Sequence, residues 1–135
     1  MHYLYTDGGS RGNPGNSAIA YFLFDEANTL VDFGGKFIGT GTNNNAEYLA
    51  LIEGLKLAKK NYIKELLVNM DSELVVNQVN KKFKVNSPDI KKLYTKVEEE
   101  MNKFDKINIA YVPREKNKLA DKMVNIVLDS VQTVQ

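Results

Sequence analysis

Hydrophobic residues recur along this 135-residue chain with two different periods. Short runs rich in aromatic and β-branched residues indicate strands, whereas apolar residues repeated about every 3.6 positions indicate amphipathic helices. The predicted strands are residues 2–7, 17–24, 30–38, 66–70 and 107–112. The predicted helices are residues 44–60, 72–80, 88–104 and 117–131. Three strands followed by helices that connect the later strands are typical of an α/β fold with a mixed sheet packed by helices.

Local side-chain chemistry predicts where the first hairpin turns and where the helices begin. The segment GGSRGNPG at positions 8–15 is a strong turn signal between the first two strands. We expect Asn43 or Asn44 to cap the first helix, because a side-chain oxygen at this position accepts a hydrogen bond from a free backbone N–H. By the same reasoning, we expect Ser72 and Ser87 to cap the next two helices.

The composition is that of a folded globular domain. Hydrophobic residues make up 43% and charged residues 26% of the chain, which excludes a disordered tail, a collagen-like repeat and a coiled-coil rod. No repeat, low-complexity tract or linker divides it, so we expect one domain over residues 1–135. Cysteine is absent, which excludes a disulfide scaffold, thiolate zinc sites and a cysteine nucleophile.

Charge and hydropathy limit the possible partners and location. Eighteen basic and seventeen acidic side chains give a net charge of +1, which provides no bulk attraction to nucleic acid or an anionic membrane, so any such partner must be recognised locally. The longest apolar run, residues 18–24, is far shorter than the roughly 20 residues of a membrane-spanning helix. No secretory signal is visible, so we expect a cytoplasmic protein without a membrane partner.

Several familiar catalytic motifs are excluded. No glycine-rich stretch ends in Gly-Lys-Ser/Thr, and GTGTNN at positions 39–44 is not a dinucleotide-binding fingerprint. The only histidine is His2, near the chain end, which leaves no base for a serine or cysteine triad. The acid–base and ligand chemistry of this protein therefore depends on carboxylates.

Four carboxylates occupy unusual positions. Asp7 stands where the first strand meets the glycine-rich turn, and Asp71 directly follows the fourth strand, so the two would meet if these strands are neighbours. Glu47 lies in the predicted first turn of its helix, on the same face as Asn43, and Asp121 interrupts the closing helix beside its apolar stripe. Converging carboxylates repel one another and need counter-ions, and hard divalent cations bind oxygen ligands. Two such ions can support phosphodiester hydrolysis.

Each of these acids, taken singly, also fits a structural role. An aspartate before glycine is commonly a turn residue, and Asp71 with Ser72 fits a helix cap. Glu47 fits a helix-dipole partner, and Asp121 fits a surface ion pair with a neighbouring lysine. Convergence in space is what would favour the metal site.

Four blocks carry a resemblance to a known family. They are TDGGSRGNPG (6–15), TNNNAEYLAL (42–51), MDSELVVNQ (70–78) and VPREKNKLADKMVN (112–125). In this order and spacing they resemble the signature blocks of type 1 ribonuclease H, in its compact archaeal and bacterial form. The resemblance spans nearly the whole chain. It implies a ribonuclease H-like fold, with a five-stranded mixed β-sheet and helices on both faces.

The resemblance also implies an activity and its residues. The family cleaves the RNA strand of RNA/DNA hybrids with two Mg²⁺ or Mn²⁺ ions, largely without sequence preference, and leaves 5′-phosphate and 3′-hydroxyl ends. The positions that match the metal-binding carboxylates are Asp7, Glu47, Asp71 and Asp121. The positions that match substrate-binding residues are Gly8, Gly9, Ser10, Asn13, Thr42, Asn43 and Asn44. Asn43 and Asn44 would contact RNA 2′-hydroxyls in the minor groove, while Asn13 and Thr42 would hold the DNA strand.

The chain departs from the family in three places. Arg114 stands where many members have a histidine; it is a candidate catalytic residue that could hold the scissile or leaving phosphate, or else a surface partner of Glu115. No tryptophan-rich basic protrusion is present; instead residues 81–96 hold six lysines, which could follow the DNA phosphates or form a solvated face. Glu73 replaces a glutamine that contacts substrate in some members.

Three functions stay open at this point. The preferred one is a metal-dependent nuclease that acts on RNA/DNA hybrids, most simply as a monomer. A second is a nuclease of the same fold that cleaves double-stranded RNA or belongs to a reverse transcriptase. A third is a nucleic-acid-binding module without catalysis, against which the complete set of four acids argues.

Overall fold

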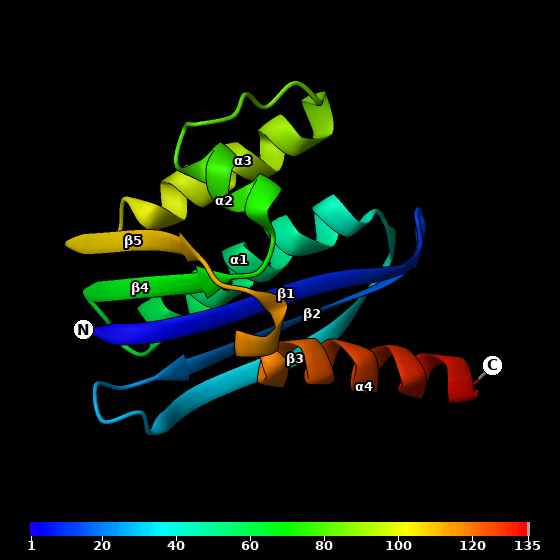
Figure 1. The fold of residues 1–135 in the computed structure, drawn as a ribbon, viewed down its shortest axis with the longest axis horizontal. Coiled ribbons are helices and arrows are strands. Elements are labelled where there is room, and N and C mark those ends of the chain that lie inside the picture. The colour runs from blue at the N-terminus through cyan, green and yellow to red at the C-terminus, as the bar shows by residue number, and fades with distance from the viewer. Residues whose placement is uncertain (135) are drawn as a thin grey trace.

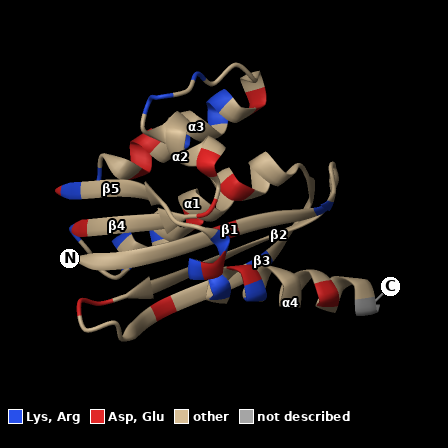
Figure 2. Ribbon diagram, in the orientation of Figure 1, with Lys and Arg blue, Asp and Glu red and all other residues tan. Residues whose placement is uncertain are grey.

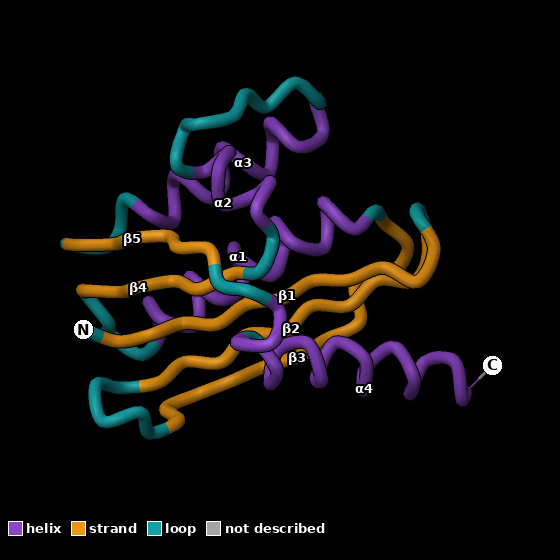
Figure 3. Tube along the Cα trace, in the orientation of Figure 1, coloured by secondary structure: helices purple, strands orange, loops and turns teal. Residues whose placement is uncertain are grey.

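The computed structural model describes residues 1–134, with side chains described for residues 1–132, and contains the predicted elements in the predicted order. The strands are β1 (His2–Gly12), β2 (Gly15–Phe24), β3 (Leu30–Gly41), β4 (Glu65–Met70) and β5 (Lys106–Tyr111). The helices are α1 (Asn43–Lys60), α2 (Glu73–Val79), α3 (Pro88–Met101), a short 3₁₀ helix η1 (Arg114–Lys116) and α4 (Lys118–Val134). Figure 3 shows mostly short loops between them, with a longer one between α2 and α3.

The five strands form one mixed sheet in the order β3-β2-β1-β4-β5. β1 pairs antiparallel with β2, and β2 with β3, whereas β1 with β4 and β4 with β5 are parallel. Figure 1 shows α4 on the near face, in front of β2 and β3, and α1 behind the sheet with α2 and α3 above it. The predicted five-stranded mixed sheet with helices on both faces is confirmed.

The first three strands are longer than predicted, and the glycine-rich segment is mostly strand. β1 and β2 pair as far as Gly12 with Gly15, so the turn itself is only residues 13–14. The glycines have a packing role instead. A Cβ on Gly8 would lie 2.2 Å from the carbonyl oxygen of Ala46 in α1, so only glycine allows this approach of helix and strand.

The helix caps are partly as predicted. Ser72 and Ser87 accept hydrogen bonds from the backbone of the first turns of α2 and α3, which confirms both predictions. The prediction for α1 was wrong, because its cap is Thr42 and not Asn43 or Asn44. Thr42 Oγ1 accepts from Asn45 N at 3.1 Å, and Asn45 Oδ1 accepts from Thr42 N at 3.3 Å. This reciprocal pair satisfies two backbone donors and selects Thr42.

Two apolar layers hold the sheet between its helices. On the α1 side, buried residues such as Leu4, Leu51 and Val68 form the larger cluster. On the α4 side, Ala18, Ala20 and Phe22 of β2 pack against Ala120, Val124 and Leu128 of α4. Burial of apolar side chains contributes roughly 1.5–3 kcal/mol each for the larger ones, and here it fixes α1 and α4 against opposite faces of β1 and β2. These contacts place the two helices on either side of the strand that carries Asp7.

Candidate active site

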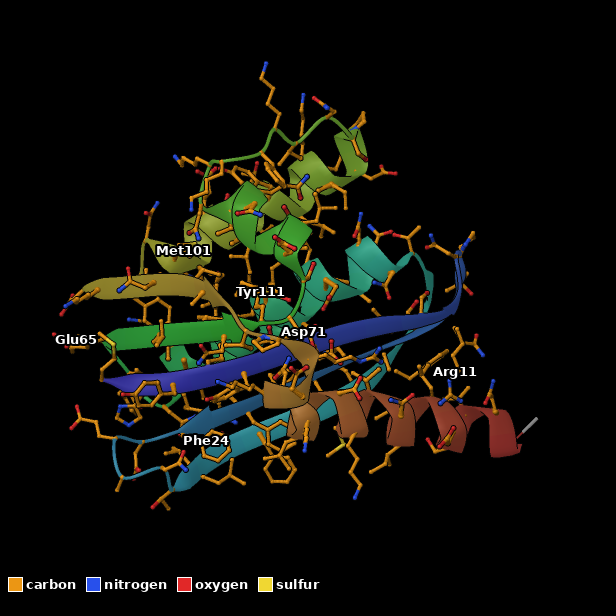
Figure 4. All side chains as sticks on the ribbon, in the orientation of Figure 1. Arg11, Phe24, Glu65, Asp71, Met101 and Tyr111 are labelled. Carbon is orange, nitrogen blue, oxygen red and sulfur yellow. The ribbon has the colours of Figure 1, made fainter. Side chains whose placement is uncertain are left out.

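The parallel pairing of β1 with β4 brings two of the predicted acids to one place. The last paired residues are Thr6 and Met70, and the next residues along the two strands are Asp7 and Asp71. Figure 4 labels Asp71 where β4 ends, next to the middle of β1. The prediction that Asp7 ends its strand was wrong, because β1 continues to Gly12 alongside β2. Asp7 lies instead where the parallel part of β1 stops.

Glu47 completes a cluster of three carboxylates. Its Oε1 accepts a 2.8 Å hydrogen bond from the backbone N–H of Gly8, which is possible because α1 packs directly on the glycine. Carboxylate oxygens of Asp7, Glu47 and Asp71 lie within 4.8 Å of one another. α1 begins at Asn43, so Glu47 stands in the second turn and not in the predicted first turn. In the second turn it lies deeper against the sheet and is 5% exposed.

Asp121 lies at the rim of this cluster and not within it. It is in the first turn of α4, and its Oδ1 accepts a 3.1 Å hydrogen bond from Nη2 of Arg114. Asp121 thus pairs with Arg114 and not with a neighbouring lysine, and Arg114 pairs with Asp121 and not with Glu115. The side chain of Arg114 is 76% exposed. Its guanidinium therefore lines the edge of the site and remains in contact with solvent.

The candidate substrate residues divide between two neighbouring cavities. A cavity of about 390 Å³ is lined by the four carboxylates, Arg114, Asn43 and residues 8–11. A second cavity of about 320 Å³ is lined by Asn13, Thr42, Asn43 and Asn44, with Ser87 and Asp89 of the α3 start. Asn43 lines both, and its backbone N–H donates to Asn13 Oδ1 at 3.1 Å. The side chain of Ser10 is used within the protein, since its hydroxyl donates to the carbonyl of Gly41 at 2.7 Å.

Burial and mutual repulsion raise the pKa values of the three clustered carboxyls. Burial, followed by the charges of Asp71 and Asp121, raises the pKa of Asp7 to about 8, although Arg114 and the Gly8 N–H oppose the rise. Burial and the charge of Asp7 also raise the pKa of Glu47 well above its ordinary value.

The pKa of Asp71 is raised by burial, and the side chain of Asn117 and the charge of Arg114 oppose this shift. Three clustered carboxyls with raised pKa values form an oxygen-only donor set. The chemistry of this set fits hard divalent cations such as Mg²⁺ or Mn²⁺, whose charge would replace the missing counter-ions.

Sequence reasoning missed one residue of the site. Asn117 is 2% exposed, and its Nδ2 donates to Asp71 Oδ2 at 3.3 Å and to the carbonyl of Thr6 at 2.9 Å. Its only sequence signal is its position in the fourth block, four residues before Asp121. An asparagine there equally fits a helix N-cap, so its neighbours could not be identified from the sequence.

The lysine-rich segment forms a separate surface. Lys81, Lys84 and Lys91 line a cavity of about 440 Å³ together with Phe83 and Tyr94. Figure 2 shows this basic segment as blue stretches in the loop between α2 and α3 and at the start of α3.

Glu73 is exposed in the first turn of α2. Among the described residues, none of the helices combines the length and hydropathy that a membrane crossing requires.

Comparison with known proteins agrees with this fold. A family model described as reverse transcriptase-like matches residues 5–127. A ribonuclease HI of Halobacterium salinarum is 38% identical over 127 residues, which cover 94% of this chain and 64% of that protein. A bifunctional protein of Mycobacterium tuberculosis is 41% identical over 128 residues, which cover 94% of this chain and 35% of that protein. The chain thus spans about a third to two thirds of these curated relatives.

Solved structures are similar over almost their whole length. The crystal structure of ribonuclease H1 from H. salinarum has a TM-score of 0.93 at 37% identity, with 96% of this chain and 98% of that chain covered. The structure of LC11-RNase H1 in complex with an RNA/DNA hybrid has a TM-score of 0.93 at 36% identity, with 98% and 99% covered. The fold is that of the ribonuclease H class. This chain belongs to the type 1 ribonuclease H family, in the group described as reverse transcriptase-like.

Proposed function

We propose that this chain is a catalytic domain that hydrolyses the RNA strand of RNA/DNA hybrids, largely without sequence preference. The observation that carries the proposal is the convergence of Asp7, Glu47 and Asp71 within 4.8 Å in an open cavity, with Asp121 and Arg114 at its rim. The hybrid-bound LC11-RNase H1, which this chain resembles over 98% of its length, supports the choice of substrate.

The four carboxylates would hold two Mg²⁺ or Mn²⁺ ions. When bound, two such ions supply an activated water and charge stabilisation for the leaving oxygen, with 5′-phosphate and 3′-hydroxyl products. Asp7 lies close to both Glu47 and Asp71, and its charge contributes to the raised pKa of Glu47. The Gly8 N–H fixes Glu47, because it donates to one of the two carboxylate oxygens and leaves the other for a ligand role.

Arg114 would act on the phosphate from the rim of the cavity. Its guanidinium faces Asp121, and it is exposed enough to move to a phosphate when one enters. A guanidinium stays protonated at neutral pH, so Arg114 would orient and neutralise a phosphate and would not transfer protons.

The two cavities would bind the two strands of the hybrid. Asn43 lines both cavities and Asn44 lines the second, and at the start of α1 the two would read RNA 2′-hydroxyls in the minor groove. Asn13 and Thr42 line the second cavity and would hold the DNA strand. The backbone of Gly8, Gly9 and Ser10 would approach the hybrid closely. The lysine-rich loop would add contacts with the phosphates that weaken as salt rises.

The test is cleavage of a labelled RNA/DNA hybrid by the purified chain with Mg²⁺, Mn²⁺ or chelator. We expect cleavage only with a metal ion and only of the RNA strand. Asp7→Asn and Asp71→Asn should each abolish metal-dependent cleavage while circular dichroism stays that of a folded protein, because each removes a charged ligand. Turnover like that of the wild type in either variant would contradict the proposal.

The same assay separates the alternatives. Preferential cleavage of double-stranded RNA would indicate the second function, and tight hybrid binding without cleavage in any metal would indicate a binding module. All proposed site residues come from one chain, so a monomer is sufficient for the proposed reaction. The monomeric state and the cytoplasmic location stay predictions.

A further inference from the structure

One buried residue, Asn117, contacts several of the segments that form the acidic site. Asn117 stands between η1 and α4, and its side chain contacts two segments that are remote in the sequence. Its Nδ2 donates to the carbonyl of Thr6, 111 positions away, and to Asp71, 46 positions away. Thr6 is the residue directly before Asp7, so this amide touches β1 and the end of β4 at the point where the two acids leave the parallel ladder.

The backbone of the same residue holds the other two site residues. The N–H of Asn117 donates to the carbonyl of Arg114 at 2.9 Å, and its carbonyl accepts from the N–H of Asp121 at 3.1 Å. Asn117 therefore joins the 3₁₀ turn that carries Arg114 to the helix turn that carries Asp121. Through its side chain it fixes both turns on the sheet beside Asp71.

The side-chain amide of Asn117 has one unfavourable feature, a buried oxygen without a hydrogen-bond partner among the described residues. Asn117 Oδ1 is fully buried, and among the described residues it has no hydrogen-bond partner. A buried acceptor without a partner lowers stability, so packing alone would favour an apolar residue of similar size at this position. The Nδ2 donor explains the choice, because it offers two N–H groups without adding a further negative charge to a cluster of acids. Local violations of this kind are common at functional sites.

We propose that Asn117 is a positioning residue that orients the Asp71 carboxylate for metal binding and aligns Arg114 and Asp121 with it. The inference rests on the proposed function and extends it to a residue that need not contact metal or substrate. Asn117 does not line the cavity of the four carboxylates, so it acts through the groups it holds. Hydrogen-bond partners of metal ligands commonly change metal affinity or activity about 10–100-fold when removed.

The test is the variant Asn117→Leu, which deletes the donor and the unpaired oxygen and roughly keeps the side-chain volume. Mn²⁺ binding is measured by titration calorimetry without substrate, and kcat and KM are measured on the hybrid well below the unfolding temperature. We expect Mn²⁺ affinity to fall about 10–100-fold. At limiting metal we expect kcat to fall, whereas KM for the hybrid changes less than twofold, because Asn117 is outside the substrate cavity.

Two further variants serve as controls. Asn80→Leu removes a matched amide bond, from Asn80 Nδ2 to the carbonyl of Ile109 in β5 at 2.9 Å, and should leave Mn²⁺ affinity unchanged. Asn117→Gln keeps the amide on a longer side chain and should recover part of the affinity lost in Asn117→Leu. If Asn117→Leu does not fold, Asn117→Gln is compared directly with the wild type, and a folded protein with weaker Mn²⁺ binding supports the proposal.

The outcomes distinguish the inference from the proposed function. An Asn117→Leu variant with lower thermal stability but wild-type Mn²⁺ affinity and kcat would overturn the positioning role. In an Asp71→Asn background the Asn117→Leu change should have a smaller effect on Mn²⁺ binding, because the carboxylate that Asn117 holds is gone; an undiminished effect would also overturn it. A wild type that binds Mn²⁺ but leaves the hybrid intact would contradict the proposed function alone, since the Mn²⁺ titrations contain no hybrid.

Discussion

Replacing Asp7 with asparagine should stabilise the metal-free protein while it removes a proposed metal ligand. Burial and the charges of Asp71 and Asp121 raise the pKa of Asp7 from 3.8 to about 8. The unfolded chain loses this proton near pH 4, whereas the native protein keeps it up to about pH 8. The native state thus binds more protons across this range. The contribution of Asp7 to stability is therefore most favourable below about pH 4 and falls as pH rises towards about 8.

The size of the effect follows from the shift. Each pKa unit corresponds to about 1.4 kcal/mol, so the upper limit at pH 7 is about 4 kcal/mol. Water that enters the cleft reduces this value, and we expect Asp7→Asn to raise the free energy of unfolding by about 2–3 kcal/mol at pH 7. At pH 4 the gain should be only about 0.5 kcal/mol, because the carboxyl is then neutral in the native state and only about half ionised in the unfolded chain.

Magnesium should reverse the order of stability. A ligand that binds only the native state stabilises it in proportion to its occupancy, and Asp7→Asn lacks one ligand. Urea unfolding followed by circular dichroism, at pH 4 and pH 7 with chelator or Mg²⁺, measures these four values for each protein. Asp105→Asn, at an exposed aspartate outside the site, is the matched control and should change little. Equal stability of Asp7→Asn and wild type in chelator at pH 7, or the same gain at both pH values, would refute the reasoning.

Three other substitutions test separate parts of the structure. Arg114→Ala should lower kcat about 10–100-fold without abolishing cleavage, because it removes a phosphate partner and no metal ligand; unchanged kinetics would make Arg114 a surface residue. Gly8→Ala should destabilise the protein by about 1–3 kcal/mol in urea unfolding, since the new Cβ would lie 2.2 Å from the Ala46 carbonyl oxygen; wild-type stability would show that α1 can move away. Lys84→Glu should raise KM for the hybrid and flatten its salt dependence, whereas Lys56→Glu on α1 should not; equal effects of the two would indicate bulk charge alone.

The elements of this fold could be predicted because their signals are local. Ser72 and Ser87 cap α2 and α3 through bonds to residues three positions away, and such spacing is visible in the sequence. The N-terminus of α1 could not be predicted to the residue, because Thr42, Asn43 and Asn44 are all competent caps. The choice depends on the return bond from Asn45.

Glycine is ambiguous for a different reason. The segment at positions 8–12 was interpreted as a turn, since glycine is frequent in turns, but it is part of β1. Glycine also permits close approach of another backbone, and Gly8 serves this purpose against α1. Which of the two roles applies depends on a helix that begins 35 residues later, so no local pattern distinguishes them.

The sequence by itself determined the order of the elements, the four acids and the elements that carry them. The tertiary structure alone decided that Asp7, Glu47 and Asp71 converge and that Asp121 stays at the rim with Arg114. It also decided that Asn117 contacts Asp71. The physical reason is that side-chain periodicity specifies which face of a strand or helix is buried, but not which elements become neighbours. These contacts depend on the strand order β1-β4 and on the register that aligns Thr6 with Met70, and both arise from packing between segments remote in the chain.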